Sequence, residues 1–548
     1  MDSHAKHSYR SIIFSSIVLF VAFFAATRWY TPTNSQSPVA VKTNAVLINP
    51  LTADLRELRG ALDNGTLQSV DLVRLYTDQI QKHDSYLKAM IRFKPLQSVI
   101  KTAEKLDKER SEGKVRGPLH GIPIVIKDNI DTHPDLGFQT TAGSYALVDS
   151  WPRKNAKIVD LLIAAGVIIL GKTNLSELSN YKGENITSGY SAVGGQVQSA
   201  YTRGNVDPDD GSDGHSNPSG SSSGSAVAVS AGYSPFSIGT ETDGSLIVPA
   251  GRAALYTIKP TIGLVPQAGI VPISATFDSA GPMAKTPYDM AVLLDMIIDP
   301  EQRPEQSYTS VLTGSWSDIS VATLDPEVWN LSSNWMRPVE SATQQMNREI
   351  RQAYAKIEVL AKSYAGNVPL IRHDALILNG KNSEHVVAAA DFVRDINAYL
   401  ATRVNSTVRN LQELIDFNER HAELELPPYS PNQDRLRRAY QQSLTADEYN
   451  EHFEHLRHVA RDQGIDFVLD TYGVDVIMAP ADSLLISYAA CSGYPIATLP
   501  LSYLDYNGRP FGLSVIARAN QEALLIKVQS AWEATFGPRK PPAGMNGT

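Results

Sequence analysis

The sequence of 548 residues contains a single cysteine, Cys491. One cysteine cannot form an internal disulfide, a Cys-x-x-Cys redox pair or a cysteine-based zinc site. Basic side chains are outnumbered: 49 lysines and arginines stand against 58 aspartates and glutamates, which gives a net charge of −9. Because no basic run interrupts this balance, a nucleic-acid partner held through phosphate contacts is not expected. The chemistry of the protein must use side chains other than cysteine.

A long apolar run is also missing. Ile12–Ala26 is apolar apart from Ser15 and Ser16, but a membrane span usually needs about 20 residues. Even residues 11–27 only approach the lower limit, and cleavage after Ala25 or Ala26 would place phenylalanine where a signal peptidase needs a small residue. We expect residues 1–45 to be a signal anchor or a cleaved signal peptide followed by a linker, with a buried helix as the third alternative. The first two place the protein in the secretory pathway, anchored to the membrane through residues 11–27 or secreted.

Sequons for N-glycosylation fit this route. The pattern N-x-[ST] occurs at six asparagines, which are Asn64, Asn174, Asn185, Asn330, Asn405 and Asn546. They predict a glycoprotein.

From about residue 46 the pattern is that of a globular α/β protein. Leucines at helical spacing predict amphipathic helices over Leu51–Arg92. Short apolar runs such as Ile122–Ile126 and Val167–Leu170 predict buried strands, and Ile158–Ala165 predicts a helix between them. This alternation favours a sheet covered by helices on both faces. We expect a single large domain over 46–540, with a variable, mostly helical region at about 300–428 and a tail at 541–548.

Residues 211–225 (GSDGHSNPSGSSSGS) have an unusual composition. Taken alone, it is typical of a flexible linker. The small apolar run Ala226–Ala231 follows without a break, so we expect the serines at the N-terminus of a packed helix, where free N–H groups favour negative charge. Further on, Gly239–Ser245 (GTETDGS) is predicted to be a turn that places a serine between two buried strands.

Two known serine patterns are matched only in part. Residues 220–224 fit G-x-S-x-G, but that elbow must follow a strand, and Asn217 and Pro218 precede it here. The pattern S-x-x-K occurs twice without its partner motifs, at Ser98/Lys101 and at Ser179/Lys182.

Three histidines invite a metal interpretation. His452, His455 and His458 are evenly spaced, but no H-E-x-x-H pattern surrounds them. We interpret them as a solvated helix face.

Several blocks, taken in order, resemble the amidase signature family. GPLHGIPIVIKDNID (117–131) is similar to its lysine segment, and TTAGS (140–144) and GKTNLSEL (171–178) to the blocks that follow. NPSGSSSGSAVAVSAG (217–232) and GTETDGSLIVPA (239–250) resemble the signature itself. The likeness extends over about residues 50–537, with a signature region at about 115–285. It implies the amidase signature fold with a large mixed central sheet, and GTETDGS looks most like the branch of bacterial peptide amidases and fungal and plant homologues.

The resemblance also implies a catalytic set of a lysine, a serine held in a cis peptide and a nucleophilic serine. Carried over by motif, these are Lys127, Ser221 and Ser245. Lysine can act as a base only when neutral, and burial lowers its pKa. Ser221 would relay the proton of Ser245 to Lys127 and return it to the leaving amine.

Neighbouring residues would support this set. Ser222 is expected to hydrogen bond within the network, and backbone N–H groups around Thr242, Asp243 and Gly244 to form the oxyanion hole. No metal or cofactor is required.

The predicted function is hydrolysis of a linear carboxamide, in a small molecule or a peptide, to an acid and ammonia or an amine through a serine acyl-enzyme. Two alternatives remain open: a membrane-associated lipid amidase similar to fatty acid amide hydrolase, and a catalytically silent amidase-like binding protein. Ile247 stands where many family members carry arginine, and Ser219 where glycine or cysteine is common. These departures leave the substrate preference open, and we expect pocket residues in the variable region.

Overall fold

The computed structural model describes residues 48–428 and 430–545. The predicted anchor or signal, its linker and Asn546 lie outside these residues. Among the residues described, none of the helices combines the length and apolar character needed to cross a bilayer. Contacts between residues group 46–548 into one compact unit.

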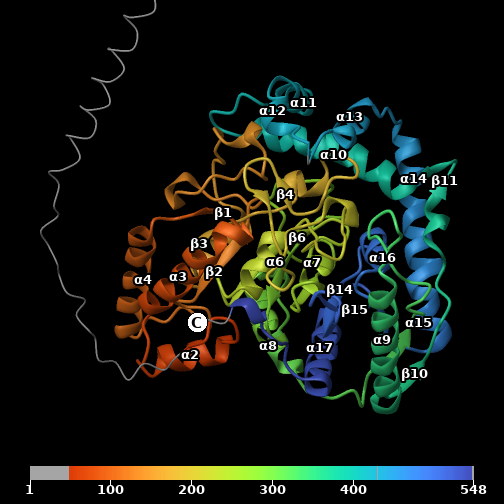
Figure 1. Ribbon diagram of the computed structural model, residues 1–548, viewed down its shortest axis with the longest axis horizontal. Coiled ribbons are helices and arrows are strands. Elements are labelled where there is room, and N and C mark those ends of the chain that lie inside the picture. The colour runs from red at the N-terminus through yellow and green to blue at the C-terminus, as the bar shows by residue number, and fades with distance from the viewer. Residues whose placement is uncertain (1–47, 429, 546–548) are drawn as a thin grey trace, which may run out of the picture. The chain divides into compact units, whose positions relative to one another are not determined.

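An 11-stranded sheet runs through this unit (Figure 1). Its strands, in spatial order, are β1 (Met90–Phe93), β3 (Ile168–Thr173), β2 (Pro123–Lys127), β6 (Phe236–Glu241), β8 (Ser279–Ala284), β7 (Tyr256–Lys259), β14 (Ile496–Tyr503), β15 (Pro510–Ile516), β13 (Val476–Pro480), β9 (Ser320–Thr323) and β10 (Ser363–Ala365). β2 pairs in parallel with β3 and β6, and β9 pairs in parallel with β13 and β10. The remaining pairs are antiparallel. The predicted large mixed sheet is confirmed.

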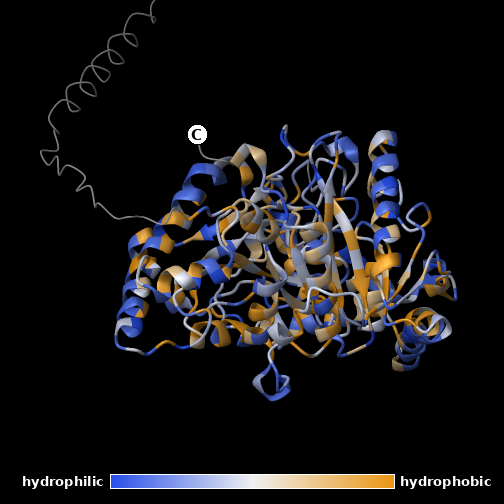
Figure 2. Cartoon of the chain, turned by 90° about the horizontal axis from the view of Figure 1, so that it is seen from below, coloured by the Kyte–Doolittle hydropathy of each residue, from blue (hydrophilic) through white to orange (hydrophobic). Residues whose placement is uncertain are grey.

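Both faces of the sheet are buried. Along β13, Val476 and Met478 belong to one apolar cluster, whereas Ile477 and Ala479 belong to another. Successive side chains of a strand point to opposite faces, so helices must cover both. Figure 2 shows apolar residues gathered around the strands and polar residues along the outer helices.

The helices flanking the sheet are α2 (Leu55–Asp63), α3 (Ser69–Leu87), α4 (Leu96–Ser111), α5 (Lys157–Ala164), α6 (Ser223–Ser230), α7 (Ile247–Gly251), α8 (Pro287–Ile297), α9 (Glu340–Leu360), α16 (Leu485–Ser492) and α17 (Glu522–Phe536). The predicted helices within Leu51–Arg92 correspond to α2 and α3, which end before β1. The serine-rich stretch does lead into a packed helix, since every residue of α6 is buried. Small side chains are needed there, because a Cβ on Gly224 would lie 2.4 Å from the carbonyl oxygens of Ala89 and Asn174.

One local prediction was wrong. The apolar run that follows Ser245 was expected to be a strand, but it forms the first turn of α7. A short apolar run looks the same in a buried strand and a buried helix. The turn therefore connects β6 to a helix.

The variable region and the helices that directly follow it lie at the top and right of Figure 1. After α9 come α10 (Ser383–Thr402), α11 (Leu411–Arg420), α12 (Ala422–Glu425), α13 (Asp434–Gln441) and α14 (Ala446–Arg457), which continues through a π-helical stretch (His458–Ile465) into α15 (Asp466–Tyr472). Buried ion pairs tie this region to the signature region. Arg403 bonds to Asp131 at 3.0 Å, and Glu425 bonds to Lys182 at 2.8 Å.

Candidate active site

Lys127 is the last residue of β2, and its side chain is fully buried. Its Nζ lies 2.7 Å from Ser221 Oγ and 2.9 Å from Ser222 Oγ. It also lies 2.9 Å from Thr240 Oγ1 and 3.1 Å from the Thr240 carbonyl oxygen. Thr240 belongs to the neighbouring strand β6. Two adjacent parallel strands therefore end on one hydrogen-bond network.

Burial lowers the pKa of Lys127 to about 7, although the charges of Asp278 and Glu241 oppose the shift. A second buried lysine provides a contrast. Lys172 on β3 has a carboxylate partner, because its Nζ lies 3.4 Å from Asp128 Oδ1. Within residues 48–428 and 430–545, no carboxylate forms an ion pair with Lys127. A buried lysine that contacts only hydroxyl and carbonyl oxygens is suited to be a neutral base near pH 7.

Ser221 and Ser222 directly precede α6. The Gly220–Ser221 peptide bond is cis, as the resemblance implies for the bridging serine. The backbone of Ser221 is held by Ser176 N, which donates to its carbonyl oxygen at 3.1 Å. Ser222 Oγ donates to the Thr240 carbonyl oxygen at 2.9 Å and accepts from Thr240 N at 3.2 Å. Both hydroxyl groups are thereby held against Lys127.

Ser245 lies in the turn between β6 and α7, and 7% of it is exposed. Ser222 N donates to its carbonyl oxygen at 3.2 Å, so the backbone of the turn touches the serine pair. Gly244 has φ +78° and approaches Ile486, where a Cβ would meet Cδ1 at 2.6 Å. A glycine is needed for both reasons. The structure thus brings Lys127, Ser221 and Ser222 together through side chains and adds Ser245 through its backbone.

Glu241 organises this turn. Its Oε2 accepts from Leu246 N at 2.6 Å and from Ile247 N at 3.0 Å. The amides of Leu246 and Ile247 are therefore occupied, whereas the N–H groups of Thr242, Asp243, Gly244 and Ser245 remain as candidates for an oxyanion hole.

The side chains of Thr242 and Asp243 face different partners. Thr242 Oγ1 donates to Asp278 Oδ1 at 2.6 Å. Asp243, which is exposed, accepts from Ser487 Oγ at 2.9 Å and shares a hydrogen bond with Glu384 of α10. Although Asp243 faces solvent, the surrounding protein partly desolvates its carboxyl group, and this together with the charge of Glu384 raises the pKa of Asp243 well above its usual range. The shift favours the protonated form of Asp243 beside Glu384.

Other predicted positions are also clear. Ile247 is fully buried in an apolar cluster. The position at which many family members carry arginine is therefore uncharged in this chain. Asn174 is buried, and its Nδ2 donates to the carbonyl oxygens of Lys88 and Gly195, both at 3.1 Å. This sequon therefore cannot carry a glycan in the folded chain, which corrects the prediction for Asn174.

The three histidines have separate partners. His452 is buried rather than solvated and bonds to Ser383 Oγ at 2.9 Å. His455 bonds to the Ala375 carbonyl oxygen, and His458 to Asp462. In the described part of the chain, no three His, Cys, Asp or Glu side chains are grouped to hold a metal ion.

Sequence reasoning missed several supporting residues. Asn129 and Glu241 lie inside the blocks at 117–131 and 239–250, so the blocks carried a signal for them, and Asp278 lies within the signature region at about 115–285. Asn129 Nδ2, for example, donates to Thr240 Oγ1 at 2.9 Å. Glu384 and Ser487 lie outside every block, and nothing in their local sequence marks them.

Comparisons with known proteins find similar chains along most of the sequence. A family model described as Amidase matches residues 71–526. A Schizosaccharomyces pombe protein described as an amidase is 31% identical over 541 residues, covering 92% of this chain and 88% of the relative. An Arabidopsis thaliana protein described as an amidase is 33% identical over 504 residues, with coverages of 89% and 91%. The structure of native peptide amidase from Stenotrophomonas maltophilia matches with a TM-score of 0.78 at 32% identity, covering 89% of this chain and 98% of the other.

Proposed function

The chain belongs to the amidase signature family, and we propose that it hydrolyses the C–N bond of a linear carboxamide through an acyl-enzyme on Ser245. The observation that carries this proposal is the buried Lys127 Nζ, which lies 2.7 Å from Ser221 Oγ and has a pKa of about 7. At neutral pH a large fraction of such a lysine is unprotonated, so it can accept a proton.

In the first half of the reaction, Ser245 Oγ attacks the amide carbonyl carbon. Its proton passes to Ser221 while the proton of Ser221 passes to Lys127. The tetrahedral oxyanion is stabilised by backbone N–H groups from the turn Thr242–Ser245, and one such donor is typically worth about 10²–10³ in rate. When the C–N bond breaks, Lys127 returns a proton through Ser221 to the nitrogen. Ammonia or an amine leaves and the acyl ester on Ser245 remains.

In the second half, water attacks the ester. Lys127 accepts one water proton through Ser221 and then returns it to Ser245 Oγ. The products are a carboxylic acid and regenerated enzyme. Every proton step uses groups of this chain, and the net reaction consumes one water.

The substrate class is part of the proposal. We place peptide amides and simple primary carboxamides first, since the Stenotrophomonas maltophilia relative is a peptide amidase. The exposed Asp243 carboxyl, two residues before Ser245, adds a polar group beside the scissile bond. Such a group favours substrates that carry N–H donors there.

The test is a panel of peptide amides, short aliphatic amides and long-chain acyl amides, assayed by released ammonia or amine. Wild type should turn over at least one class, and Ser245→Ala should lose that activity. A fluorophosphonate probe should label wild type at Ser245 and leave Ser245→Ala unlabelled. Folded wild-type protein that the probe never labels would support a silent binding protein, and turnover rising steadily with acyl length would support a lipid amidase.

We also propose that residues 11–27 direct the chain into the secretory pathway. The support is the apolar run, together with exposed sequons at Asn64, Asn330 and Asn405. Expression in a eukaryotic cell, with enzymatic deglycosylation and N-terminal sequencing of the product, tests the route and separates an anchor from a cleaved signal. An unshifted gel mobility after deglycosylation, in protein from the cytosolic fraction, would contradict it.

A further inference from the structure

The turn at residues 242–245, which carries the proposed nucleophile Ser245 and is called the nucleophile turn below, connects β6 to α7. Its end is tied back to β6 by a side chain. Glu241 Oε2 accepts from Leu246 N at 2.6 Å and from Ile247 N at 3.0 Å. The chain that leaves the nucleophile turn is therefore fixed to the strand that enters it.

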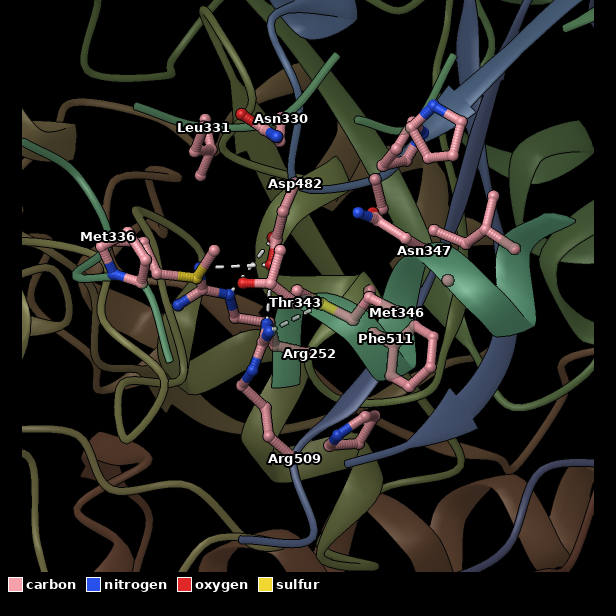
Figure 3. A pocket seen from close by; sticks show the side chains of 18 residues that line it. Arg252, Asn330, Leu331, Met336, Thr343, Met346, Asn347, Asp482, Arg509 and Phe511 are labelled. Carbon is pink, nitrogen blue, oxygen red and sulfur yellow. Dashed lines mark hydrogen bonds and ion pairs between the residues drawn. The ribbon is translucent and has the colours of Figure 1, made fainter. Parts of the chain in front are cut away.

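The far end of α7 has a separate attachment. Arg252 follows the last residue of this helix, and its Nε lies 3.3 Å from Asp482 Oδ1. Arg509 Nη1 lies 2.6 Å from Asp482 Oδ2, and Figure 3 shows the three side chains meeting among the residues that line a pocket. The element after the nucleophile is thus held at both of its ends.

The start of the nucleophile turn is held by a hydroxyl group. Thr242 directly follows the last residue of β6, so the chain leaves the sheet at this residue. Thr242 Oγ1 donates to Asp278 Oδ1 at 2.6 Å, a short distance that is typical of a hydroxyl group donating to a carboxylate. The position of Thr242 therefore depends on Asp278.

Asp278 is itself well placed to hold this hydroxyl group. Ser279 begins β8 and lies opposite Glu241 of β6, so Asp278 and Thr242 are the next residues of the two paired strands. Asp278 Oδ2 accepts from Ile273 N at 2.8 Å and from Ser274 N at 3.0 Å. The loop at 273–278 thus closes around the carboxylate that accepts from Thr242.

This bond acts on the groups that stabilise an oxyanion. The N–H groups of Thr242 and Asp243 belong to the two peptide planes that meet at the Thr242 Cα, and a bond from the Thr242 side chain restrains both planes. A hydrogen bond weakens steeply when its donor turns away from the acceptor. Donors that are fixed in advance stabilise the transition state most, because they do not reorganise during the reaction.

We propose that Thr242 is a positioning residue, whose hydroxyl group, held by Asp278, keeps the N–H groups at the start of the nucleophile turn directed at the oxyanion. The inference rests on the proposed hydrolysis through Ser245. Because the oxyanion forms only after the nucleophile attacks, loss of the hydroxyl group lowers kcat and leaves KM nearly unchanged.

The test is a comparison of Thr242→Val and Thr242→Ser in steady-state kinetics, with an amide that wild type hydrolyses. Valine keeps the branched shape without the hydroxyl group, and serine keeps the hydroxyl group. Thr242→Val should lower kcat by about tenfold or more, since a misdirected donor loses part of the roughly 10²–10³ that it contributes. Its KM, and both constants of Thr242→Ser, should stay within about threefold of wild type. A Thr242→Val variant with the kcat of wild type, or equal losses in the two variants, would overturn the proposal.

Ser274→Ala is the matched control, because it removes a hydroxyl group from the loop that closes around Asp278. Ser274 Oγ donates to Asp391 Oδ2 at 2.6 Å and not to the nucleophile turn. This variant should lose thermal stability and keep kcat within about threefold of wild type. If Ser274→Ala lost as much kcat as Thr242→Val, the integrity of the loop would set turnover and the proposed role of Thr242 would be wrong.

A further variant covers the case in which Thr242→Val does not fold. Thr242→Ala also removes the hydroxyl group but places no methyl group against the carboxylate, and both Thr242 and Asp278 are partly exposed, so water can solvate Asp278. Its kcat should fall as expected for valine, and an unchanged kcat contradicts the proposal. Wild type that hydrolyses no amide and takes no fluorophosphonate label at Ser245 would exclude both the proposed function and this inference. Active wild type with equally active Thr242 variants would exclude this inference alone.

Discussion

The signature region and the variable region contribute to the same molecule in different ways. The signature region, at about 115–285, supplies Lys127, Ser221 and Ser245 on strand ends and turns whose sequence blocks are recognisable. The variable region, at about 300–428, has no such blocks, yet its side chains reach the buried interior. Glu384 meets Asp243, two residues before the proposed nucleophile Ser245, and Arg403 and Glu425 bond to residues of the signature region.

This difference shows that the reacting groups and the contacts that position them are encoded in different parts of the sequence. The reacting groups need neighbours only a few residues or one strand away, so short blocks specify them. The variable region acts through single long-range contacts, such as that of Ser144 Oγ with Glu425 Oε1 at 3.0 Å. Removing a reacting group should therefore abolish turnover and leave the fold intact. Removing a side chain that joins the two regions should instead lower the stability of the fold and leave the reacting groups in place.

The largest expected effect is on turnover by Lys127→Met. Loss of the base should lower kcat by about 10²–10⁴-fold. Methionine should keep the fold, because it removes a buried amine and fills similar space. Measuring kcat together with thermal unfolding separates the two effects. Turnover within tenfold of wild type would remove Lys127 from the mechanism.

The next effect is on stability, in Arg403→Met. Arg403 is fully buried and donates to Asp131 Oδ1, to Ser150 O and to Thr140 O. Its loss leaves the buried Asp131 without its cation, and breaking a buried pair in this way typically costs about 3–5 kcal/mol. The free energy of unfolding in urea measures this cost.

Arg437→Met is the control for that variant. Arg437 lies on α13 and pairs with Glu419, and the two side chains are 49% and 48% exposed. An exposed pair is worth about 1 kcal/mol or less, so this variant should remain close to wild type. Equal losses in Arg437→Met and Arg403→Met would mean that burial of the arginine is not what matters.

The pH dependence of kcat/KM should follow Lys127. Because the active form is the neutral amine and burial lowers the pKa to about 7, activity should be lost as pH falls through 7. It should decline about tenfold per pH unit below that value and level off above it. A rate profile between pH 5 and 9 checks this, and a midpoint near 4 would indicate a carboxylate base instead.

The smallest effect should come from the contact between the two regions at Asp243 and Glu384. Asp243→Asn and Glu384→Gln each keep a hydrogen-bonding group, so each should change kcat/KM by less than about tenfold. Residues in direct contact usually couple by about 0.5–3 kcal/mol, so the double variant should lose less than the sum of the two losses. A double-mutant cycle with a primary and an N-alkylated amide measures the coupling, and additive losses would show that the contact plays no part in substrate choice.

The sequence predicted most of the local structure. Strand β2 and helix α5 lie within one residue of the predicted runs Ile122–Ile126 and Ile158–Ala165, and β3 begins one residue after the start of the predicted run Val167–Leu170 and ends three residues beyond it. The order of the strands could not be predicted, because β7 pairs with β14 across more than 200 residues. The short helix α7 was missed because an apolar run of four residues shows no periodicity that would distinguish a helix from a strand.

The site residues also divide into those that the sequence blocks predicted and those that depend on tertiary contacts. The blocks located Lys127, Ser221 and Ser245, and Glu241 was visible inside one of them. The hydrogen bonds of Glu241 with the Leu246 and Ile247 amides could not be predicted, because they depend on how a buried side chain turns back on its own loop. Glu384 could not be predicted either, because a contact with Asp243 across 141 residues leaves no periodic signal.

The hydrogen bonds around Lys127 also set a direction for proton movement. A neutral amine has two hydrogens and one lone pair. The hydroxyl hydrogen of Ser222 is used on the Thr240 carbonyl oxygen, so Ser222 must accept one N–H of Lys127, and Thr240 accepts the other. In the proposed neutral state, the lone pair of Lys127 is left for the hydroxyl hydrogen of Ser221 or of Thr240. When Ser221 donates to that lone pair, its oxygen is free to accept the proton of Ser245, which is the direction of proton movement that the proposed hydrolysis requires.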